Sequence, residues 1–147
     1  MIRLEDDQYC FVCGSRNPCG LQISFRREGH KVISEFTPAR HFQGYTNVLH
    51  GGVIAAVLDE IIVQAAMVQG FSPVTAEMRI RYKKPAPTER PLKIEGEVVH
   101  ASSRLVEGKG RLLDAASGML LAEADAKMVL IDNERVRAVS QELHGPS

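Results

Sequence analysis

LHGGVIAAVLDE, residues 49–60, is the stretch of sequence that decides the fold of this chain. Its apolar residues recur with a helical period, which predicts an α-helix that begins at Gly51 and runs to about Gln69, where Gly70 and Pro73 end it. The first N–H groups of a helix have no partner within the helix and lie at the positive end of its dipole. Because glycine has no Cβ, a ligand oxygen can approach these groups closely. The sequence therefore predicts an oxyanion hole at this helix start.

Asp59 is the second informative residue of this stretch. It follows Gly52 by seven positions and so lies on the same helical face, next to apolar residues three and four positions away: Ala55, Ala56, Ile62 and Val63. Glu60 and Gln64 form a separate polar stripe, about 100° from Asp59 around the helix axis. An acidic residue in a helix is usually a solvated surface group, and two glycines before a helix are often only a turn. The competing prediction is a functional carboxylate in apolar surroundings.

The length and composition of the chain limit what this helix can belong to. The 147 residues are 44% apolar, which predicts one domain over residues 1–147, with a leader at 1–20, a core at 21–131 and a polar tail at 132–147. Lys plus Arg and Asp plus Glu both number 18, so the balance of charge does not indicate a nucleic-acid partner. The absence of a long apolar run and of a signal-peptide pattern predicts no membrane association and a cytoplasmic protein.

Three cysteines, Cys10, Cys13 and Cys19, lie within the leader. A Cys-x-x-Cys pair can supply two of the four ligands of a structural zinc site, but no second such pair follows, and His30 or His41 would complete the set only by chance of folding. An odd number of cysteines argues against a disulfide framework. We therefore expect structural thiols and no metal, with a metal site or a redox pair as the alternatives.

Six segments have the pattern of β-strands. They are residues 21–27, 32–36, 74–83, 92–101, 105–115 and 119–131. A hairpin turn is expected at Gly29, and a loop over residues 38–49 leads into the helix. In the third segment, strict alternation predicts that Val74 and Ala76 share a face with Met78. Six strands with one long helix after the second predict an α+β fold with an antiparallel sheet.

The order of these elements and three stretches of sequence resemble the hotdog-fold thioesterases, specifically the branch that contains the phenylacetyl-CoA thioesterases and the mammalian thioesterase superfamily members. The stretches are CFVCGSRNPCGL (10–21), HFQGYTNVLHGGVIAAVLDE (41–60) and PVTAEMRIRYKKPAP (73–87). The resemblance implies an antiparallel sheet wrapped around one central helix and hydrolysis of an acyl-CoA. It also implies no cofactor, coenzyme A entering only as part of the substrate, and a homodimer or a dimer of dimers with the active site built across the interface.

The resemblance assigns roles to the helix start and to two further residues. It implies that the Gly51 N–H polarises the thioester carbonyl, and that Asp59 acts as general base or nucleophile. The hydroxyl of Thr75 would hold the attacking water, although a threonine in a strand is often only a good β-former. His50 would bind the thioester or shape the loop, and Gly52 would contact the substrate.

The sequence departs from the relatives at Gly44, because relatives often have an asparagine six residues before the histidine. Gln43 and Asn47 are the candidates to replace that side chain.

Three cations, Arg79, Arg81 and Lys83, alternate along the third strand segment. They are candidates to bind the phosphates of coenzyme A, and an ordinary solvated strand face is the alternative. Phe42, Met67 and Phe71 are candidates to line the tunnel for the acyl group. The sequence does not identify the acyl group. The functional alternatives are a hotdog dehydratase or hydratase, which would need a histidine and acid pair, and a non-catalytic acyl-CoA-binding module.

Overall fold

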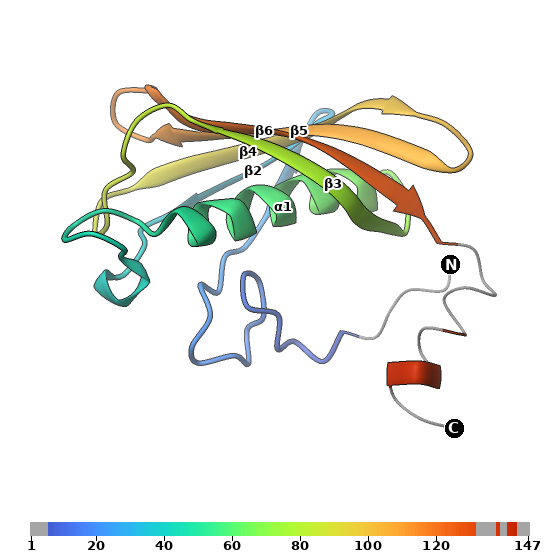
Figure 1. The fold of residues 1–147 in the computed structure, drawn as a ribbon, viewed down its shortest axis with the longest axis horizontal. Helices are drawn as coiled ribbons and strands as arrows, with labels where there is room; N and C mark the ends of the chain where they lie inside the picture. The colour runs from blue at the N-terminus through green and yellow to red at the C-terminus, as the bar shows by residue number, and fades with distance from the viewer. Residues whose placement is uncertain (1–5, 132–137, 139–140, 144–147) are drawn as a thin grey trace.

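The computed structural model of the chain describes residues 6–131, 138 and 141–143. Six strands form one antiparallel sheet in the order β1-β2-β4-β5-β6-β3, and α1 lies along one face of that sheet (Figure 1). The elements are β1 (Arg26–Glu28), β2 (Lys31–Phe36), the 3-10 helix η1 (Arg40–Phe42), α1 (Gly51–Met67), β3 (Pro73–Tyr82), β4 (Leu92–Ala101), β5 (Leu105–Asp114) and β6 (Leu120–Leu130). The predicted α+β fold, with an antiparallel sheet wrapped around one long helix, is confirmed.

Helix α1 is the centre of the core. It begins at Gly51, as the sequence predicts, and ends at Met67, two residues before the predicted end. The residues it buries are spaced by three and four: Ile54, Val57, Leu58, Ile61, Ile62, Ala65 and Ala66. Burying a large aliphatic side chain stabilises a fold by about 1.5–3 kcal/mol. The apolar stripe therefore fixes which helical face meets the sheet, and with it the direction in which Asp59 points.

The helix approaches the sheet closely at two glycines. A Cβ on Gly96 of β4 would lie 2.7 Å from the Ile61 carbonyl oxygen, and one on Gly108 of β5 would lie 2.6 Å from Ile62 Cγ2. Neither distance is compatible with a real Cβ, and the Ile61 carbonyl is backbone that cannot rotate away. These glycines let the middle of the sheet hold the centre of the helix in a fixed place.

The first predicted strand, residues 21–27, is mostly wrong. Only Arg26 and Arg27 of that segment belong to β1. The Leu21 N–H donates to the Phe11 carbonyl and the Ile23 N–H to the Val12 carbonyl, both at 2.9 Å, so this backbone pairs with the leader and not with the sheet. The hairpin that follows is confirmed, since β1 pairs antiparallel with β2 around Gly29, which has a φ of +64°.

The strict alternation predicted for β3 is also wrong. The register against β6 pairs Thr75 with Met128 and Glu77 with Lys127, so Ala76 is the extra residue of a β-bulge. A bulge inserts one residue and reverses the alternation on either side of it. Met128 is fully buried on the helix side of the sheet, so Thr75 points to the helix, while Val74 and Ala76 are exposed.

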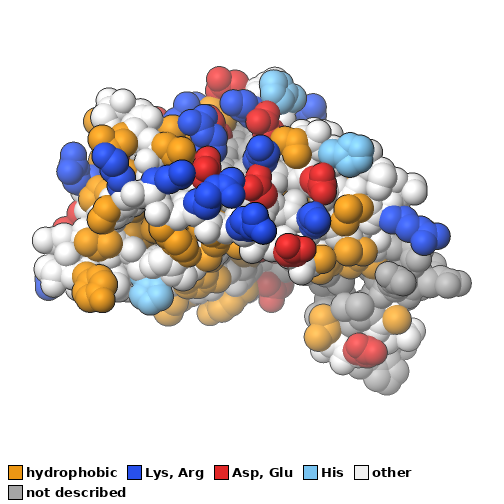
Figure 2. Space-filling view, turned by 45° about the horizontal axis from the view of Figure 1, so that its top comes forward, with side chains coloured by type: hydrophobic (Ala, Val, Ile, Leu, Met, Phe, Trp, Pro, Cys, Tyr) orange, Lys and Arg blue, Asp and Glu red, His pale blue; other side chains and the backbone are white. Residues whose placement is uncertain are grey.

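The other face of the sheet carries interleaved charges, visible as mixed blue and red side chains in Figure 2. The ion pairs run between neighbouring strands, for example from Lys31 and Arg111 to Glu95. Across the described ranges, no helix is long and apolar enough to span a membrane. Most of the polar tail predicted for residues 132–147 lies outside the described residues.

Candidate functional site

Asp59 and Thr75 meet in the structure. The Thr75 hydroxyl donates a hydrogen bond of 2.6 Å to Asp59 Oδ1, and both side chains are half-buried. Bonds of an O–H to a carboxylate are short and stronger than those between neutral groups. The helix supplies the carboxylate and the bulged strand β3 supplies the donor. One carboxylate oxygen is therefore held by the protein, and the other remains for a proton or a substrate atom.

The start of α1 is capped by the side chain of His50. Its Nδ1 accepts a hydrogen bond of 2.8 Å from the Gly52 N–H, which places the imidazole proton on Nε2. The Val53 and Ile54 N–H groups both donate to the His50 carbonyl. Among the described residues, the Gly51 N–H has no acceptor. Gly51 is the residue that the resemblance implies as the oxyanion donor. In the first turn of the helix, its N–H is the one that neither the side chain nor the carbonyl of His50 accepts.

A hollow of about 640 Å³ opens beside this helix start, and its lining includes Tyr45, His50, Gly51, Tyr82 and Lys84. The Tyr82 hydroxyl donates to the Gly51 carbonyl at 2.9 Å, which fixes the last residue of β3 against the helix. Sequence reasoning missed Tyr82, since its place in the apolar alternation marks it as a core residue, whereas it is 55% exposed.

Gln43 and Asn47, the candidates to replace the asparagine, contact each other in the loop before the helix. Gln43 Oε1 accepts a hydrogen bond of 3.2 Å from the Asn47 N–H, so the Gln43 side chain closes the turn that Asn47, with a φ of +62°, completes. Gly44 lies against His50, where a Cβ would be 3.4 Å from the His50 Cα. Position 44, where the resemblance implies an asparagine, is therefore directly beside the capping histidine, and glycine leaves it without a side chain.

The predicted phosphate-binding cations lie on the outer face of the sheet. Arg81 donates to Glu123 at 3.1 Å and to Asp125 at 3.0 Å, and these hydrogen bonds raise the pKa of its guanidinium. Lys83 lies 3.8 Å from Glu123 and also lines the hollow at the helix start. Arg79 sits opposite Asp125 in the register of β3 and β6. Lys83 is thus the member of this set that the structure brings to the helix start.

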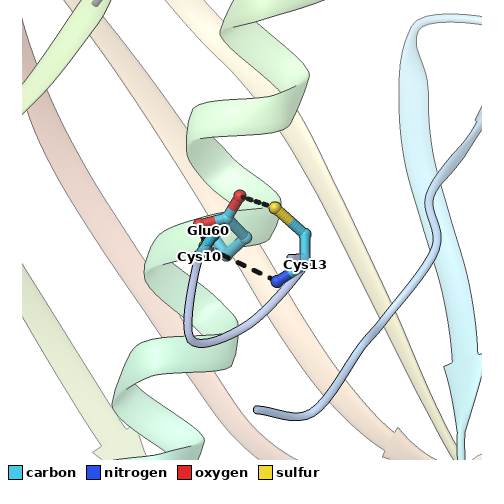
Figure 3. A group of neighbouring side chains, drawn as sticks. All are labelled: Cys10, Cys13 and Glu60. Carbon is cyan, nitrogen blue, oxygen red and sulfur yellow. Dashed lines mark hydrogen bonds between the residues drawn. The ribbon is translucent and has the colours of Figure 1, made fainter. Parts of the chain in front are cut away.

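A second cluster joins the leader to α1 (Figure 3). The Cys13 thiol donates to Glu60 Oε1 at 3.3 Å, and the Cys10 thiol donates to Glu60 Oε2 at 3.8 Å. Burial, and after it the charge of Glu60, raise the pKa of the Cys13 thiol, so the free thiol keeps its proton. These three side chains are close enough together to hold one metal ion. Sequence reasoning missed Glu60, because only the fold brings it to the cysteines.

Comparison with known proteins agrees with this architecture. The thioesterase superfamily model matches residues 46–123, and the chain belongs to this family. The acyl-coenzyme A thioesterase THEM4 of Mus musculus is 28% identical over 110 residues, which are 71% of this chain and 45% of the relative. The chain therefore spans less than half the length of that curated relative.

Two solved structures share the fold. A thioesterase superfamily protein superposes with a TM-score of 0.79 at 24% identity, over 83% of this chain and 60% of that one. A Streptococcus mutans protein bound to acetyl CoA superposes with a TM-score of 0.69 at 23% identity, over 74% of this chain and 88% of that one. The predicted resemblance to the hotdog-fold thioesterases is confirmed.

Proposed function

We propose that this chain hydrolyses an acyl-CoA thioester to a free acid and coenzyme A. The observation that carries the proposal is the pair of half-buried groups on one helix. Asp59 is held by Thr75 at 2.6 Å, and the Gly51 N–H is left open by the His50 cap. A thioesterase needs a group that activates water or attacks the carbonyl, and a fixed donor for the oxygen that becomes negative. Asp59 and Gly51 are groups of these two kinds.

In the general-base form of the reaction, Asp59 takes a proton from water as the water oxygen adds to the thioester carbon. The carbonyl oxygen becomes an oxyanion and accepts a hydrogen bond from the Gly51 N–H. When the tetrahedral intermediate collapses, the C–S bond breaks and the coenzyme A sulfur receives the proton that Asp59 carries. In the nucleophilic form, Asp59 adds to the carbon directly, and the C–S bond breaks as coenzyme A leaves as a thiolate that takes a proton from solvent. Water then hydrolyses the resulting anhydride to the free acid and the Asp59 carboxylate. Both forms use the same two groups.

A single copy of the chain cannot bring both groups to one carbonyl. Gly51 and Asp59 are eight residues apart on α1, or about 12 Å at 1.5 Å per residue. Strand β3 forms one edge of the sheet, with Thr75 beside Asp59 near its start and Tyr82 on Gly51 at its end. If the β3 edges of two copies pair antiparallel, the start of one strand lies beside the end of the other. We therefore propose a homodimer, or a dimer of dimers, in which Asp59 of one protomer faces Gly51 of its partner.

The solved relative that contains acetyl CoA supports a coenzyme A thioester as the substrate class. Lys83 and Lys84 line the hollow at the helix start and are the proposed contacts of its phosphates. Arg79, four residues before Lys83 on the outer face of β3, is the proposed third contact. Met67 and Phe71 line a second hollow of about 610 Å³ near the other end of α1 and are candidates for the acyl group. Phe42 instead packs in the core, with its ring centroid 6.1 Å from that of Phe11. A cytoplasmic location and the absence of a cofactor stay predictions.

Release of free thiol from a panel of acyl-CoA substrates, followed with a thiol reagent, tests this proposal. Hydrolysis releases one thiol for each acid formed. A dehydratase or hydratase would change the acyl chain without releasing thiol, and a binding module would retain intact acyl-CoA. The panel varies chain length and aromaticity, so the best substrate also identifies the acyl group. Binding of acyl-CoA with no thiol release on any member would reject the thioesterase proposal.

A further inference from the structure

The Cys10, Cys13 and Glu60 side chains lie close enough together to hold one metal ion. Zinc binds sulfur at about 2.3 Å and carboxylate oxygen at about 2.1 Å, so at a tetrahedral angle the two ligand atoms are about 3.6 Å apart. The Cys13 Sγ to Glu60 Oε1 distance is 3.3 Å and the Cys10 Sγ to Glu60 Oε2 distance is 3.8 Å, so each sulfur lies near a different oxygen of the carboxylate. One ligand atom from each residue lies within 4.8 Å of the other two. A small shift of the Glu60 carboxylate, so that one oxygen serves both sulfurs, would let the cluster close around an ion.

The turn that carries the two cysteines is fixed before any ion binds. The Val12 and Cys13 N–H groups lie 3.4 and 3.5 Å from Cys10 Sγ and donate to it. The Gly14 N–H donates to the Cys10 carbonyl at 2.9 Å, and a Cβ on Gly14 would lie 2.4 Å from the Cys10 nitrogen, so the turn accepts only glycine there. These contacts hold the Cys10 sulfur in a fixed position beside Glu60.

Acidic side chains dominate the surroundings of the cluster. Among the residues that the structure describes, the adjacent hollow of about 610 Å³, which Met67 and Phe71 also line, has three carboxylates, those of Asp6, Asp7 and Glu60, and no Lys, Arg or His. Within the described ranges, no ion pair involves any of these carboxylates. The Gln64 amide, which donates to Glu60 at 3.0 Å, is a neutral partner. A half-buried carboxylate with two thiols and further acids nearby favours a bound cation.

We propose that Cys10, Cys13 and Glu60 bind one Zn²⁺ ion, with the fourth coordination position open to water from the adjacent hollow. On binding, the two thiols release their protons to solvent and form two Zn–S bonds, and Glu60 adds one Zn–O bond. Two sulfur ligands and one oxygen ligand suit zinc better than calcium or magnesium, which prefer six or more oxygen ligands. The site opens into the hollow that Met67 and Phe71 also line, but its three ligands are none of the groups proposed for hydrolysis.

The ion would fasten the leader to α1. Glu60 follows Asp59 directly on the helix, and Cys10 and Cys13 belong to a segment outside the sheet. Because a metal that binds only the folded state stabilises that state, removing it should lower the melting temperature of the protein.

Metal titration of the full chain, reduced and treated with a chelator, tests this site. We expect one zinc per chain by elemental analysis. We also expect that Co²⁺ added in place of zinc gives thiolate-to-cobalt charge-transfer absorption with tetrahedral d–d bands. We expect at least about 10-fold weaker zinc binding in each of Cys10→Ser, Cys13→Ser and Glu60→Gln. Substituting a residue that only hydrogen-bonds to a metal ligand typically costs this much affinity, and a ligand itself should cost at least as much. Cys19→Ser is the matched control, since Cys19 is an exposed thiol of the same leader outside the cluster.

The wild-type cobalt spectrum does not depend on how the variants fold. A spectrum without thiolate charge transfer would overturn the proposal, and so would full zinc affinity in Glu60→Gln or loss of binding in Cys19→Ser. A cluster that only forms hydrogen bonds would take up no zinc. A redox pair would instead appear as a Cys10–Cys13 disulfide in protein isolated without reductant, together with no zinc uptake after reduction. Either result would reject the metal site.

Discussion

Replacing Gly51 by proline removes the proposed oxyanion donor and little else. Gly51 is the first residue of α1, where proline is well tolerated because its fixed φ suits the helix and the lost N–H has no helical partner. The residue before a proline must be extended, and His50 has φ of −59° and ψ of 133°. A Cβ on residue 51 would lie 3.6 Å from the Tyr82 ring, which is an ordinary contact. The helix should therefore form as before.

The expected loss follows from the role of the N–H group. Removing one oxyanion donor typically lowers kcat by about 10²- to 10³-fold, or about 2.7–4 kcal/mol of transition-state stabilisation. Gly51→Ala is the matched variant, because it adds the Cβ but keeps the N–H. The loss that belongs to the N–H is the ratio of kcat for Gly51→Ala to kcat for Gly51→Pro, and we expect that ratio to fall in the range above.

The assay is thiol release from the best acyl-CoA substrate at saturating concentration, with circular dichroism and the melting temperature recorded for each variant. If the two variants fold like wild type and have equal kcat, the Gly51 N–H is not the oxyanion donor. A loss confined to KM would show that the N–H binds substrate and transition state equally, which also contradicts its assigned role.

Three further predictions follow from the structure. Thr75→Val keeps a β-branched side chain but removes the donor to Asp59, so kcat should fall about 10- to 100-fold with KM nearly unchanged. Thr75→Ser should recover much of the lost kcat. A wild-type kcat in Thr75→Val would show that Thr75 has only a structural role in the strand. Neutralising Arg79 and Lys83 together should raise KM for acyl-CoA and leave kcat unchanged. The difference in KM between wild type and variant should vanish at high salt, and also for a short thioester that lacks the nucleotide. An equal loss of activity on acyl-CoA and on the short thioester would indicate that the substitutions damage the fold. Gly96→Ala places a Cβ against the Ile61 carbonyl, so the free energy of unfolding should fall by about 1–3 kcal/mol in denaturant titrations, and an unchanged midpoint would mean that the helix can move away.

The sequence is sufficient to predict the central helix because its signals are local. Glycines at the start, apolar spacing and a terminal Gly70 all lie within about twenty residues, and Asp59 inherits its orientation from that helix. The strands of the large hairpins were predictable for the same reason, and β4 matches its predicted bounds.

The features that could not be predicted depend on pairing between distant segments. The bulge at Ala76 exists only in the register of β3 against β6, and it is what turns Thr75 towards Asp59. Residues 21–25 have a strand pattern, but the Leu21 and Ile23 N–H groups donate to carbonyls of the leader. The sequence pattern places Glu60 on the solvent-exposed polar face of the helix, and its contact with Cys13 joins residues 47 positions apart in the sequence. Local periodicity carries no information on such contacts.

The most direct measurement of the central claim is kcat for Asp59→Asn beside Glu77→Gln. Asparagine has nearly the shape of aspartate, but it can neither take a proton from water nor attack the thioester. Glu77 is an exposed acid on the outer face of the same strand that carries Thr75, so its amide variant tests the loss of a negative charge alone. We predict that Asp59→Asn folds like wild type and loses nearly all thiol release, while Glu77→Gln stays close to wild type. A kcat for Asp59→Asn above about a tenth of the wild-type value would contradict the account and remove Asp59 from the mechanism.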